Sequence, residues 1–327
     1  MTRAAFRQGD REHFPAAQQR ALRSAIRWQL FTIGYTVCTI VVIAFVLGNS
    51  QAMRTAWIED MLSLLPQLAF FAALLLVRRK PSLKHPYGWH RAMGVGHLVA
   101  GVALLVVGTQ LAIEAATGLV AAEHPTIGTL RVLGHTVWLG WIMIGVMAVI
   151  VVGPVLLYGP AKARIAPVLH NKLLLADADM AQADWHTNAA SIVGVLGVGL
   201  GLWWLDGAAA LFIALGIVRD GLHNTGAAIS DLMDQRARTV DGAEPHPLGA
   251  EIVTRLRELE WVADAAVRIR DEGQVLHVEA FVQPREASVR LEGLAAAAEL
   301  ISSLDWKVHD VVVVPSDPLP EYADRGD

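Results

Sequence analysis

Long runs of apolar residues constrain this sequence more strongly than any other feature. The clearest run, GHTVWLGWIMIGVMAVIVVGPVLLY at residues 134–158, contains no charged side chain. A helix needs about 20 such residues to cross the hydrocarbon core of a bilayer. The sequence predicts an all-α membrane bundle of six spanning helices, because five further stretches qualify, at residues 28–48, 57–77, 93–117, 176–205 and 206–230. The last two are the most polar, and we include them because a short WWLD turn joins two apolar runs.

The balance of charge changes sign near residue 236. Residues 1–235 carry 17 Lys and Arg against 13 Asp and Glu, whereas residues 236–327 carry 10 against 18, so the net charges are +4 and −8. The single cysteine, Cys38, lies inside an apolar run, which excludes a disulfide framework and a thiolate metal cluster. We divide the chain into an N-terminal segment (1–27), a helical membrane domain (28–235), a linker (236–248), a small domain (249–318) and a tail (319–327).

The acidic second part predicts a small cytoplasmic α+β domain. Apolar residues recur at helical spacing over residues 248–260, and an alanine-rich helix is expected over residues 287–303. Apolar and polar residues alternate along residues 276–283, which is typical of a strand with one buried face. The strands are expected at residues 265–270, 274–283 and 308–315. The resulting αββαβ order predicts a ferredoxin-like arrangement.

Basic residues are concentrated in alternate loops. One set comprises Arg3, Arg7, Arg11, Arg20, Arg23, Arg27, Arg78, Arg79, Lys80, Lys84, Arg91, Lys162, Arg164 and Lys172. The opposite loops hold only Arg54 and Arg131. Because cytoplasmic loops carry an excess of Lys and Arg, we expect both termini in the cytoplasm of a multi-pass protein of the inner cell membrane.

Polar side chains form a stripe along the fifth predicted span. The residues Asp177, Met180, Asp184, Asn188 and Ser191 follow one another at intervals of three or four, so they share one face of a helix. All of these side-chain types can contact a cation, and an ionisable residue inside a spanning helix usually marks an ion pathway. The stripe therefore predicts a cation path. The alternative for Asp184 is a structural hydrogen bond to a neighbouring helix.

The second predicted span carries a matching set of polar residues near its outer end. Glu59 and Ser63 are four residues apart and share a helix face, and Asp60 lies one position round. These groups complete a cation site if the second and fifth spans are neighbours. The alternative is that Glu59 and Asp60 lie at the membrane surface and are only solvated.

Three motifs resemble those of the cation diffusion facilitators, over about residues 25–315. HPYGWHRA at residues 85–92 is similar to the loop HPYGHGRAE of that family. Asp206, 22 positions beyond Asp184, is similar to an aspartate that opens the sixth helix of the family. The fifth-helix pattern of the family is matched by Ala176, Asp177, Met180, Asp184 and Asn188, with Met180 in place of the usual histidine.

The resemblance implies six spanning helices, cytoplasmic termini and a dimerising C-terminal domain. It also implies export of a divalent metal in exchange for protons, through a site with two ligands from the second helix and two from the fifth. Ser63 stands where an aspartate is usual. Oxygen donors favour manganese or iron(II) and a thioether favours softer ions, so zinc, manganese, iron and cobalt all stay open. The candidate metal residues are Glu59, Asp60, Ser63, Asp177, Met180, Asp184 and Asn188.

Additional metal sites are less well supported. Ser82 and Trp89 stand where the resemblance would place an aspartate and a histidine, so His85 and His90 are expected to be turn or interface residues. The tail lacks the His–x–Asp–Pro motif of the family, and His277 is expected to be exposed. The remaining candidates for a regulatory metal are His246, His277 and Asp317.

We therefore predict a secondary active transporter, not an enzyme, that exports a divalent metal ion by alternating access and proton antiport. Metal ligands must be deprotonated, so metal ions and protons compete for Asp184 and for Asp60 or Glu59. Asp177 is expected to line the access path. The expected partners are the transported ion, the lipid bilayer and a second copy of the chain, without nucleic acid or a resident cofactor. Two alternatives are a non-transporting relative, acting as dimer partner or metal sensor, and a membrane-bound enzyme.

Overall fold

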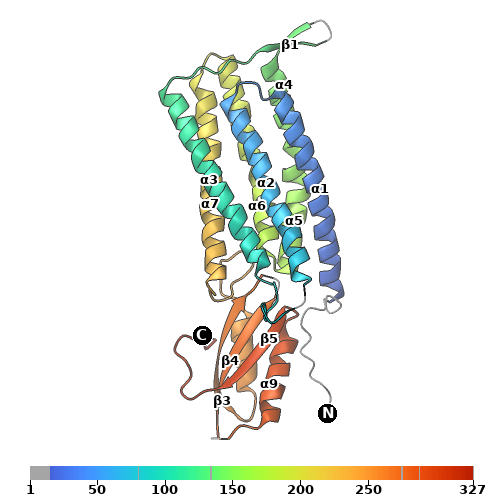
Figure 1. Ribbon diagram of the computed structural model, residues 1–327, viewed down its shortest axis with the longest axis vertical. Coiled ribbons are helices and arrows are strands. Elements are labelled where there is room, and N and C mark those ends of the chain that lie inside the picture. The colour runs from blue at the N-terminus through green and yellow to red at the C-terminus, as the bar shows by residue number, and fades with distance from the viewer. Residues whose placement is uncertain (1–14, 80, 133–134, 274, 287, 327) are drawn as a thin grey trace.

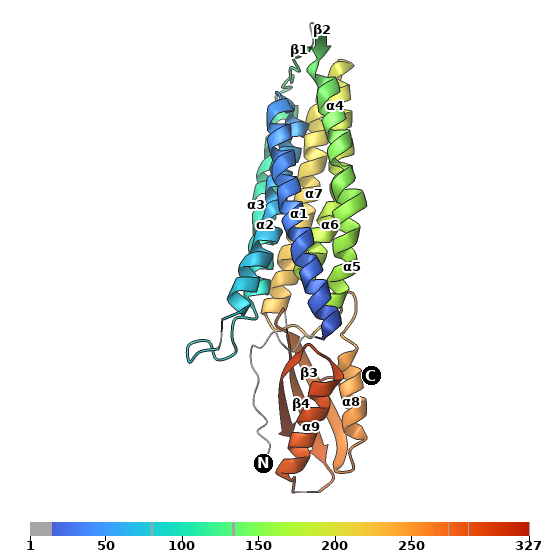
Figure 2. The ribbon, with the colours of Figure 1, turned by 90° about the vertical axis from the view of Figure 1, so that its right-hand side faces the viewer.

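The computed structural model describes residues 15–79, 81–132, 135–273, 275–286 and 288–326. Some residues named in the sequence analysis lie outside the described residues. They are Arg3, Arg7, Arg11 and Lys80 of the basic loops, Gln274 and Ala287 at the ends of predicted elements, and most of the N-terminal segment. In the described part, a long helical region stands on a small α+β region, and α1 begins at the end of the bundle nearest that region (Figures 1 and 2).

Four helical segments are long and apolar enough to cross a membrane. They are α1 (Ala16–Val46), α2 (Gln51–Val77), α3 (Ala92–Val120) and the continuous segment Leu139–Leu169. Two further long helices, α6 (Lys172–Gly199) and α7 (Trp204–Leu232), run beside them (Figure 1). The membrane-type helical region is thus confirmed, and the crossing of the membrane by α6 and α7 stays a prediction.

The fourth predicted span is displaced along the sequence. Residues 134–158 were expected to be helical, but β2 (His135–Trp138) pairs with β1 (Thr129–Val132) in an antiparallel hairpin. The helical segment begins only with α4 (Leu139–Ile150) and continues through the π-helix η2 (Gly153–Tyr158) into α5 (Gly159–Leu169). Lys162, expected in a basic loop, therefore lies in a helix, and it is completely buried. Apolar content marks the spans but does not mark where a helix ends.

Helices α3 and α7 pack closely along their length because glycines face the partner helix. A Cβ at Gly221 would overlap the backbone of Leu105, and one at Gly101 would lie 2.8 Å from the backbone nitrogen of Thr225. Small residues allow close approach of helices in membranes. At the end away from the α+β region, Asp206 joins α7 to α2: it accepts hydrogen bonds from Ser50 Oγ (2.5 Å) and from the Gln51 backbone nitrogen (2.6 Å).

The second part of the chain has the expected αββαβ order. Helix α8 (Leu248–Arg257) and α9 (Leu291–Leu304) accompany a sheet of order β3-β4-β5. Strands β3 (Val262–Asp271) and β4 (Leu276–Pro284) are antiparallel, and β5 (Val308–Pro315) is parallel to β4. Leu276, Val278, Ala280 and Val282 are fully buried, as the alternation along β4 predicts, but the opposite face is also partly covered, since His277 and Phe281 are only 6% and 7% exposed. The ferredoxin-like arrangement remains a prediction.

The predicted tail packs against the sheet. Leu319 and Ala323 join Ala266 and Phe281 in a small apolar cluster. The backbone of Asp324 forms two hydrogen bonds with Val267 on the edge strand β3. The last described residues therefore protect one edge of the sheet, which is otherwise a row of unpaired backbone groups.

A buried group of charges joins the two regions. Asp271 at the end of β3 lies 3.0 Å from Lys307 Nζ and 3.8 Å from Lys172 Nζ, and Lys172 is 2.7 Å from Asp231 of α7. Burial opposes ionisation of Asp271, but the charges of Lys307 and Lys172 outweigh it and hold the pKa of that carboxyl below its usual range. Burial, reinforced by the charge of Lys307, lowers the pKa of His170 to about 3.

Candidate functional site

Helices α2 and α6 bring three carboxyl groups together in the middle of the bundle. Asp184 of α6 lies within electrostatic range of both Glu59 and Asp60 of α2. The two helices are antiparallel neighbours: Glu59 lies beside Thr187, and Gly194 lies against Ala52. The two polar sets that the sequence analysis singled out are therefore side by side. All three carboxyl groups are partly buried, so none of them points freely into the surrounding membrane.

Neighbouring polar side chains form hydrogen bonds with one of these carboxyl groups and with two backbone oxygens beside them. Thr39 Oγ1 of α1 donates a hydrogen bond of 3.0 Å to Asp60 Oδ2. Ser63 Oγ donates to the backbone oxygen of Asp60 at 2.8 Å, and Asn188 Nδ2 donates to the backbone oxygen of Asp184 at 2.8 Å. Ser63 and Asn188 thus use their donors within their own helices. Their side-chain oxygens remain free to accept from, or to bind, another group.

Several buried oxygen atoms near the carboxyl groups have no hydrogen-bond partner in the described part of the chain. These atoms are Glu59 Oε2, Asn188 Oδ1 and Ser191 Oγ. A buried polar atom without a partner is rare, because its desolvation is not compensated. Oxygen atoms that lack a donor suit a cation. In the described residues, no three His, Cys, Asp or Glu side chains are close enough to hold a metal, so these groups have to converge when one binds.

Met180 occupies a different environment from the carboxyl groups. Its side chain packs against an apolar cluster that contains Leu62, Leu104 and Ile213. It also lines a cavity of about 620 Å³ between α6 and α7. The thioether is therefore held by apolar neighbours, whereas the carboxyl groups are surrounded by oxygen atoms.

The cavity between α6 and α7 extends from Met180 and Ala183 to the end of the bundle nearest the α+β region, where Lys172 and Asp241 line it. Its wall carries acidic, basic and histidine side chains: Asp179, Asp220, Asp231, Asp241, Lys172, Arg219, Arg238, His97 and His223. Met180 and Ala183 are the lining residues nearest to Asp184 in the sequence, whereas Glu59, Asp60 and Asp184 are not among the residues that line this cavity.

Asp177 lies in a buried ion pair and is not among the residues that line this cavity. Its Oδ2 is 2.6 Å from Lys162 Nζ, and the exposed fractions of the two side chains are 5% and 0%. Gln29 Nε2 donates to the same oxygen at 2.8 Å, and Gln67 Nε2 lies 3.5 Å from Oδ1. The structure thus places the first residue of the stripe in a closed polar cluster.

Lys162 and a polar stripe on α1 were missed by the sequence analysis. The signal for the stripe was present, since Gln29, Thr32, Thr36 and Thr39 follow at intervals of three or four residues inside an apolar run. All four side chains are buried. Lys162 gave no such signal, because it follows the charge-free run and was taken as part of a loop.

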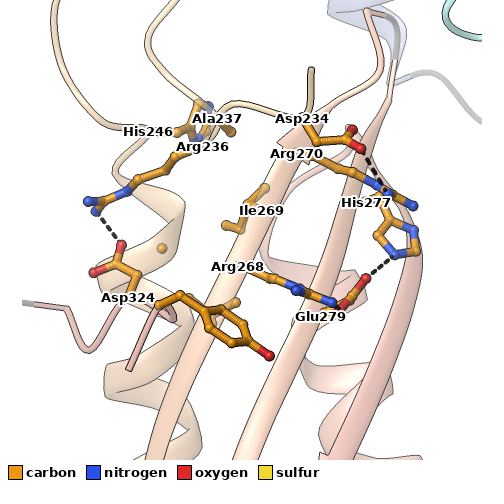
Figure 3. A pocket seen from close by; sticks show the side chains of 13 residues that line it. Asp234, Arg236, Ala237, His246, Arg268, Ile269, Arg270, His277, Glu279 and Asp324 are labelled. Atoms are coloured by element: carbon orange, nitrogen blue, oxygen red, sulfur yellow. Dashed lines mark hydrogen bonds and ion pairs between the residues drawn. The ribbon is translucent and has the colours of Figure 1, made fainter. Parts of the chain in front are cut away.

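The histidines that were candidates for a regulatory metal site have other partners. His277, expected to be exposed, is 6% exposed and lies between Asp310 (3.0 Å) and Glu279 (3.4 Å). It lines a cavity of about 440 Å³ together with His246, whereas Asp317 accepts a hydrogen bond from Gln283 at 2.8 Å outside it. Figure 3 shows three guanidinium groups in the same cavity, from Arg236, Arg268 and Arg270. Each guanidinium group is paired with a carboxylate of the cavity, so these carboxylates are already engaged: Asp324, Glu279 and Asp234.

His85 and His90 lie in the loop between α2 and α3. The His85 ring is 4.1 Å from Trp89, and the His90 ring is 5.3 Å from that of His309 on β5. Burial, with a contribution from the charge of His309, lowers the pKa of His90 to about 4. His90 therefore contacts the α+β region, as expected for an interface residue.

Comparison with known proteins gives a match over most of the helical region. Residues 27–233 match the family described as the cation efflux transmembrane domain. The uncharacterized transporter YdbO of Bacillus subtilis (strain 168) is 24% identical over 281 residues, which cover 86% of this chain and 90% of that protein. The manganese efflux system protein MneS of the same strain is 21% identical over 240 residues, which cover 72% of this chain and 75% of that protein.

Proposed function

The chain belongs to the cation efflux family, and from this premise we propose that it exports a divalent transition-metal cation from the cytoplasm in exchange for protons. Proteins of this family transport metal cations across membranes and are not enzymes. What we propose beyond the family is the identity of the ion, its exchange for protons, and the residues that bind the ion and the protons.

One observation carries the proposal: Glu59, Asp60 and Asp184 are partly buried between α2 and α6 and lie within electrostatic range of one another. Charged groups inside a membrane are costly and occur mainly where they serve an ion pathway. Three carboxylates without a bound cation would repel one another strongly in this setting. A divalent cation or protons relieve that repulsion, so metal and protons bind alternately to the same groups.

Alternating access is supported by the difference between the two ends of the bundle. The α6–α7 cavity leads from the end nearest the α+β region to Met180. At the other end, the hydrogen bonds of Asp206 to Ser50 and Gln51 hold α2 and α7 together. We propose that this conformation accepts metal from the cytoplasm. Release to the other side then requires the cavity to close and the outer ends of the helices to separate.

The donor atoms favour manganese among the ions that the sequence leaves open, with iron(II) next. Carboxylate, carboxamide and hydroxyl oxygens suit Mn²⁺, whereas zinc usually takes histidine or cysteine ligands. In the described residues around Asp184, the oxygens come from Glu59, Asp60, Asn188 and Ser191. The similarity to a manganese efflux protein points the same way.

The orientation and assembly follow from the same family and from the distribution of charge. We propose that α6 and α7 also span the inner membrane, that both termini face the cytoplasm, and that the protein works as a homodimer. Basic residues such as Arg78, Arg79 and Lys84 lie at the end of the bundle nearest the α+β region, which supports a cytoplasmic location for that end.

The proposal is tested by Mn²⁺ flux in liposomes that contain the purified protein and a pH gradient. Asp184→Asn is expected to reduce proton-driven Mn²⁺ flux by on the order of 100-fold or more, because a ligand and a proton carrier are both lost. Glu114→Gln is the matched control, since Glu114 lies on α3 in a half-exposed ion pair with Arg54. Equal flux in wild type and Asp184→Asn would refute the proposal. Mn²⁺ binding without flux in the wild type would support the metal-sensor alternative.

A further inference from the structure

The ion pair of Lys162 and Asp177 is a buried charge cluster that metal binding at Asp184 does not explain. Asp177 precedes Asp184 by seven residues, so it lies on the same face of α6, about 10 Å nearer the α+β region. A buried ion pair contributes little to stability, because the desolvation of two charges offsets their attraction. Stability alone therefore does not explain why this ion pair is buried between four helices.

Each partner of Asp177 comes from a different helix. Lys162 is on α5, Gln29 on α1 and Gln67 on α2, and all three side chains are buried. The Lys162 ammonium also lies 5.1 Å from the centre of the Tyr158 ring. One carboxylate on α6 thus holds α1, α2 and α5 together at a single level of the bundle.

An apolar cluster closes the same four helices on the side nearer the α+β region. It contains Met93 of the neighbouring α3 and seven residues of these four helices, all buried: Ala25, Phe70, Ala73, Leu74, Ala166, Leu173 and Leu174. Ala25, Ala166 and Leu173 each lie about one helical turn from Gln29, Lys162 and Asp177 respectively. In the described residues, the space between α1, α2, α5 and α6 on this side of the charges is lined by these buried apolar side chains.

The other side of α6 carries a polar cavity instead of a packed apolar cluster. There the α6–α7 cavity, lined by Asp179, Met180 and Ala227 among others, approaches Asp184 from the same end of the molecule. Two routes from the cytoplasm to the carboxyl groups are thus conceivable, one on each side of α6. The first is closed by the ion pair and the apolar cluster, and the second is open.

We propose that the cluster of Lys162, Asp177, Gln29 and Gln67 is the inner closure of the transport path. This inference rests on the proposed function. The cluster keeps α1, α2, α5 and α6 closed at their cytoplasmic ends, so that the α6–α7 cavity is the route by which metal arrives. When that cavity closes, the site is separated from the cytoplasm, and proton and metal movements remain coupled. Lys162 and Asp177 are positioning residues and not ligands of the cargo.

Cysteine labelling tests the closure without relying on transport. With Cys38→Ala as background, Ala166→Cys reports on the apolar cluster and Ala227→Cys on the cavity, and a membrane-impermeant thiol reagent is applied to the cytoplasmic face of inverted vesicles. We expect Ala166→Cys to react at least about tenfold more slowly than Ala227→Cys, because it reacts only after local opening. Comparable rates in this otherwise unaltered chain would overturn the proposal.

Removal of the charges gives the second test. Lys162→Met leaves Asp177 unpaired and can impair folding, so the neutral double variant Lys162→Met/Asp177→Asn is examined with it. In the double variant we expect Ala166→Cys to react about tenfold faster than in the parent chain, and Mn²⁺ to leak from loaded liposomes in the absence of a pH gradient. A double variant that keeps Ala166→Cys protected and retains tight coupling would show that the pair serves only folding.

A failure of the proposed closure can be distinguished from a failure of the proposed function. Mn²⁺ binding to the purified double variant is expected to stay within about threefold of wild type, because Glu59, Asp60 and Asp184 are unchanged. If Ala166→Cys becomes reactive in the double variant while Mn²⁺ binding is retained, the result supports the closure. If wild-type protein does not bind or move Mn²⁺ at all, the proposed function fails, while the labelling rates still decide whether the closure exists.

Discussion

At the scale of single residues, the site combines oxygen atoms from two helices with an adjacent thioether that has apolar neighbours. Asp184, Glu59 and Asp60 interact through their charges, and Met180 packs against Leu62 on the side of α3 and α7. The difference in surroundings separates two roles. We propose that the carboxyl groups hold the cation and that the methionine shapes the inner end of the cavity.

The role of Met180 is tested by Met180→Leu. Because the replacement conserves volume and the site is apolar, we expect stability to change by less than about 1.5 kcal/mol. We also expect Mn²⁺ flux to stay within about threefold of wild type, since hard oxygen ligands are unaffected. Flux is measured in liposomes, with Asp184→Asn as the inactive reference. A loss as large as that of Asp184→Asn would make Met180 a ligand.

The histidines at the junction of the two regions predict how stability depends on pH. The pKa of His170 is lowered to about 3, so below pH 6.5 the unfolded chain binds a proton that the folded chain excludes. Folding therefore loses stability as the pH falls from about 6.5 towards 3, by about 2 kcal/mol between pH 7 and pH 5 for this residue. His90 contributes with the same sign.

His170→Asn isolates this contribution. His170 has a left-handed backbone (φ 46°), which asparagine tolerates, and asparagine does not titrate. The fall in the unfolding midpoint between pH 7 and pH 5, measured by thermal unfolding, should be smaller in His170→Asn than in wild type. His135→Asn on the exposed outer hairpin serves as the control. An unchanged pH dependence in His170→Asn would contradict the assignment.

At the scale of elements, close packing of α3 on α7 depends on glycines at the contact. Gly221→Ala places a methyl group against the backbone of Leu105, so the helices have to separate. We expect a loss of about 1–3 kcal/mol in stability. Gly216→Ala on the same helix meets no atom within 4 Å and should be neutral or stabilising, because alanine favours the helix by about 1 kcal/mol. Thermal unfolding in detergent compares the two; equal effects would contradict the packing.

The sequence predicted the elements unevenly, for physical reasons. Apolar length identified the first three spans, but α1 begins at Ala16 rather than at residue 28, and α2 begins at Gln51 rather than at residue 57. It failed at the fourth, because hydropathy does not distinguish the hairpin strand His135–Trp138 from a helix, or the buried Lys162 from a loop lysine. Strand β5 matched residue for residue, because a run of β-branched valines that ends at a proline defines it.

Helical spacing showed which polar side chains share a face within each helix, and the family resemblance placed the second and fifth spans side by side. The structure brings Asp184 within electrostatic range of Glu59, and their role as metal ligands stays a prediction. The sequence could not reveal that Asp177 pairs with Lys162, a contact that depends on the packing of α5 against α6. It also could not reveal that His277 is buried between Asp310 and Glu279, since that depends on the order of strands in the sheet.

At the scale of the whole molecule, a buried charge group connects the helical region to the α+β region. Asp271→Asn leaves Lys307, which is 2% exposed, without its carboxylate, and removal of one partner of a buried pair typically costs about 3–5 kcal/mol. We expect the two regions to separate more readily, so that limited proteolysis between residues 234 and 247 accelerates. Asp264→Asn, in a half-exposed pair with Arg257, should cost less than about 1 kcal/mol. Equal cleavage of both variants would argue against the connection.

The account as a whole depends on one shared cation site between α2 and α6. Mn²⁺ binding to the purified full-length chain measures it most directly, because free Mn²⁺ gives an electron paramagnetic resonance signal that is lost on binding. Wild-type protein is expected to bind Mn²⁺ at a site that disappears in Glu59→Gln/Asp60→Asn/Asp184→Asn and persists in Glu114→Gln. Undiminished binding by the triple variant would contradict the assignment of these carboxyl groups as the metal site.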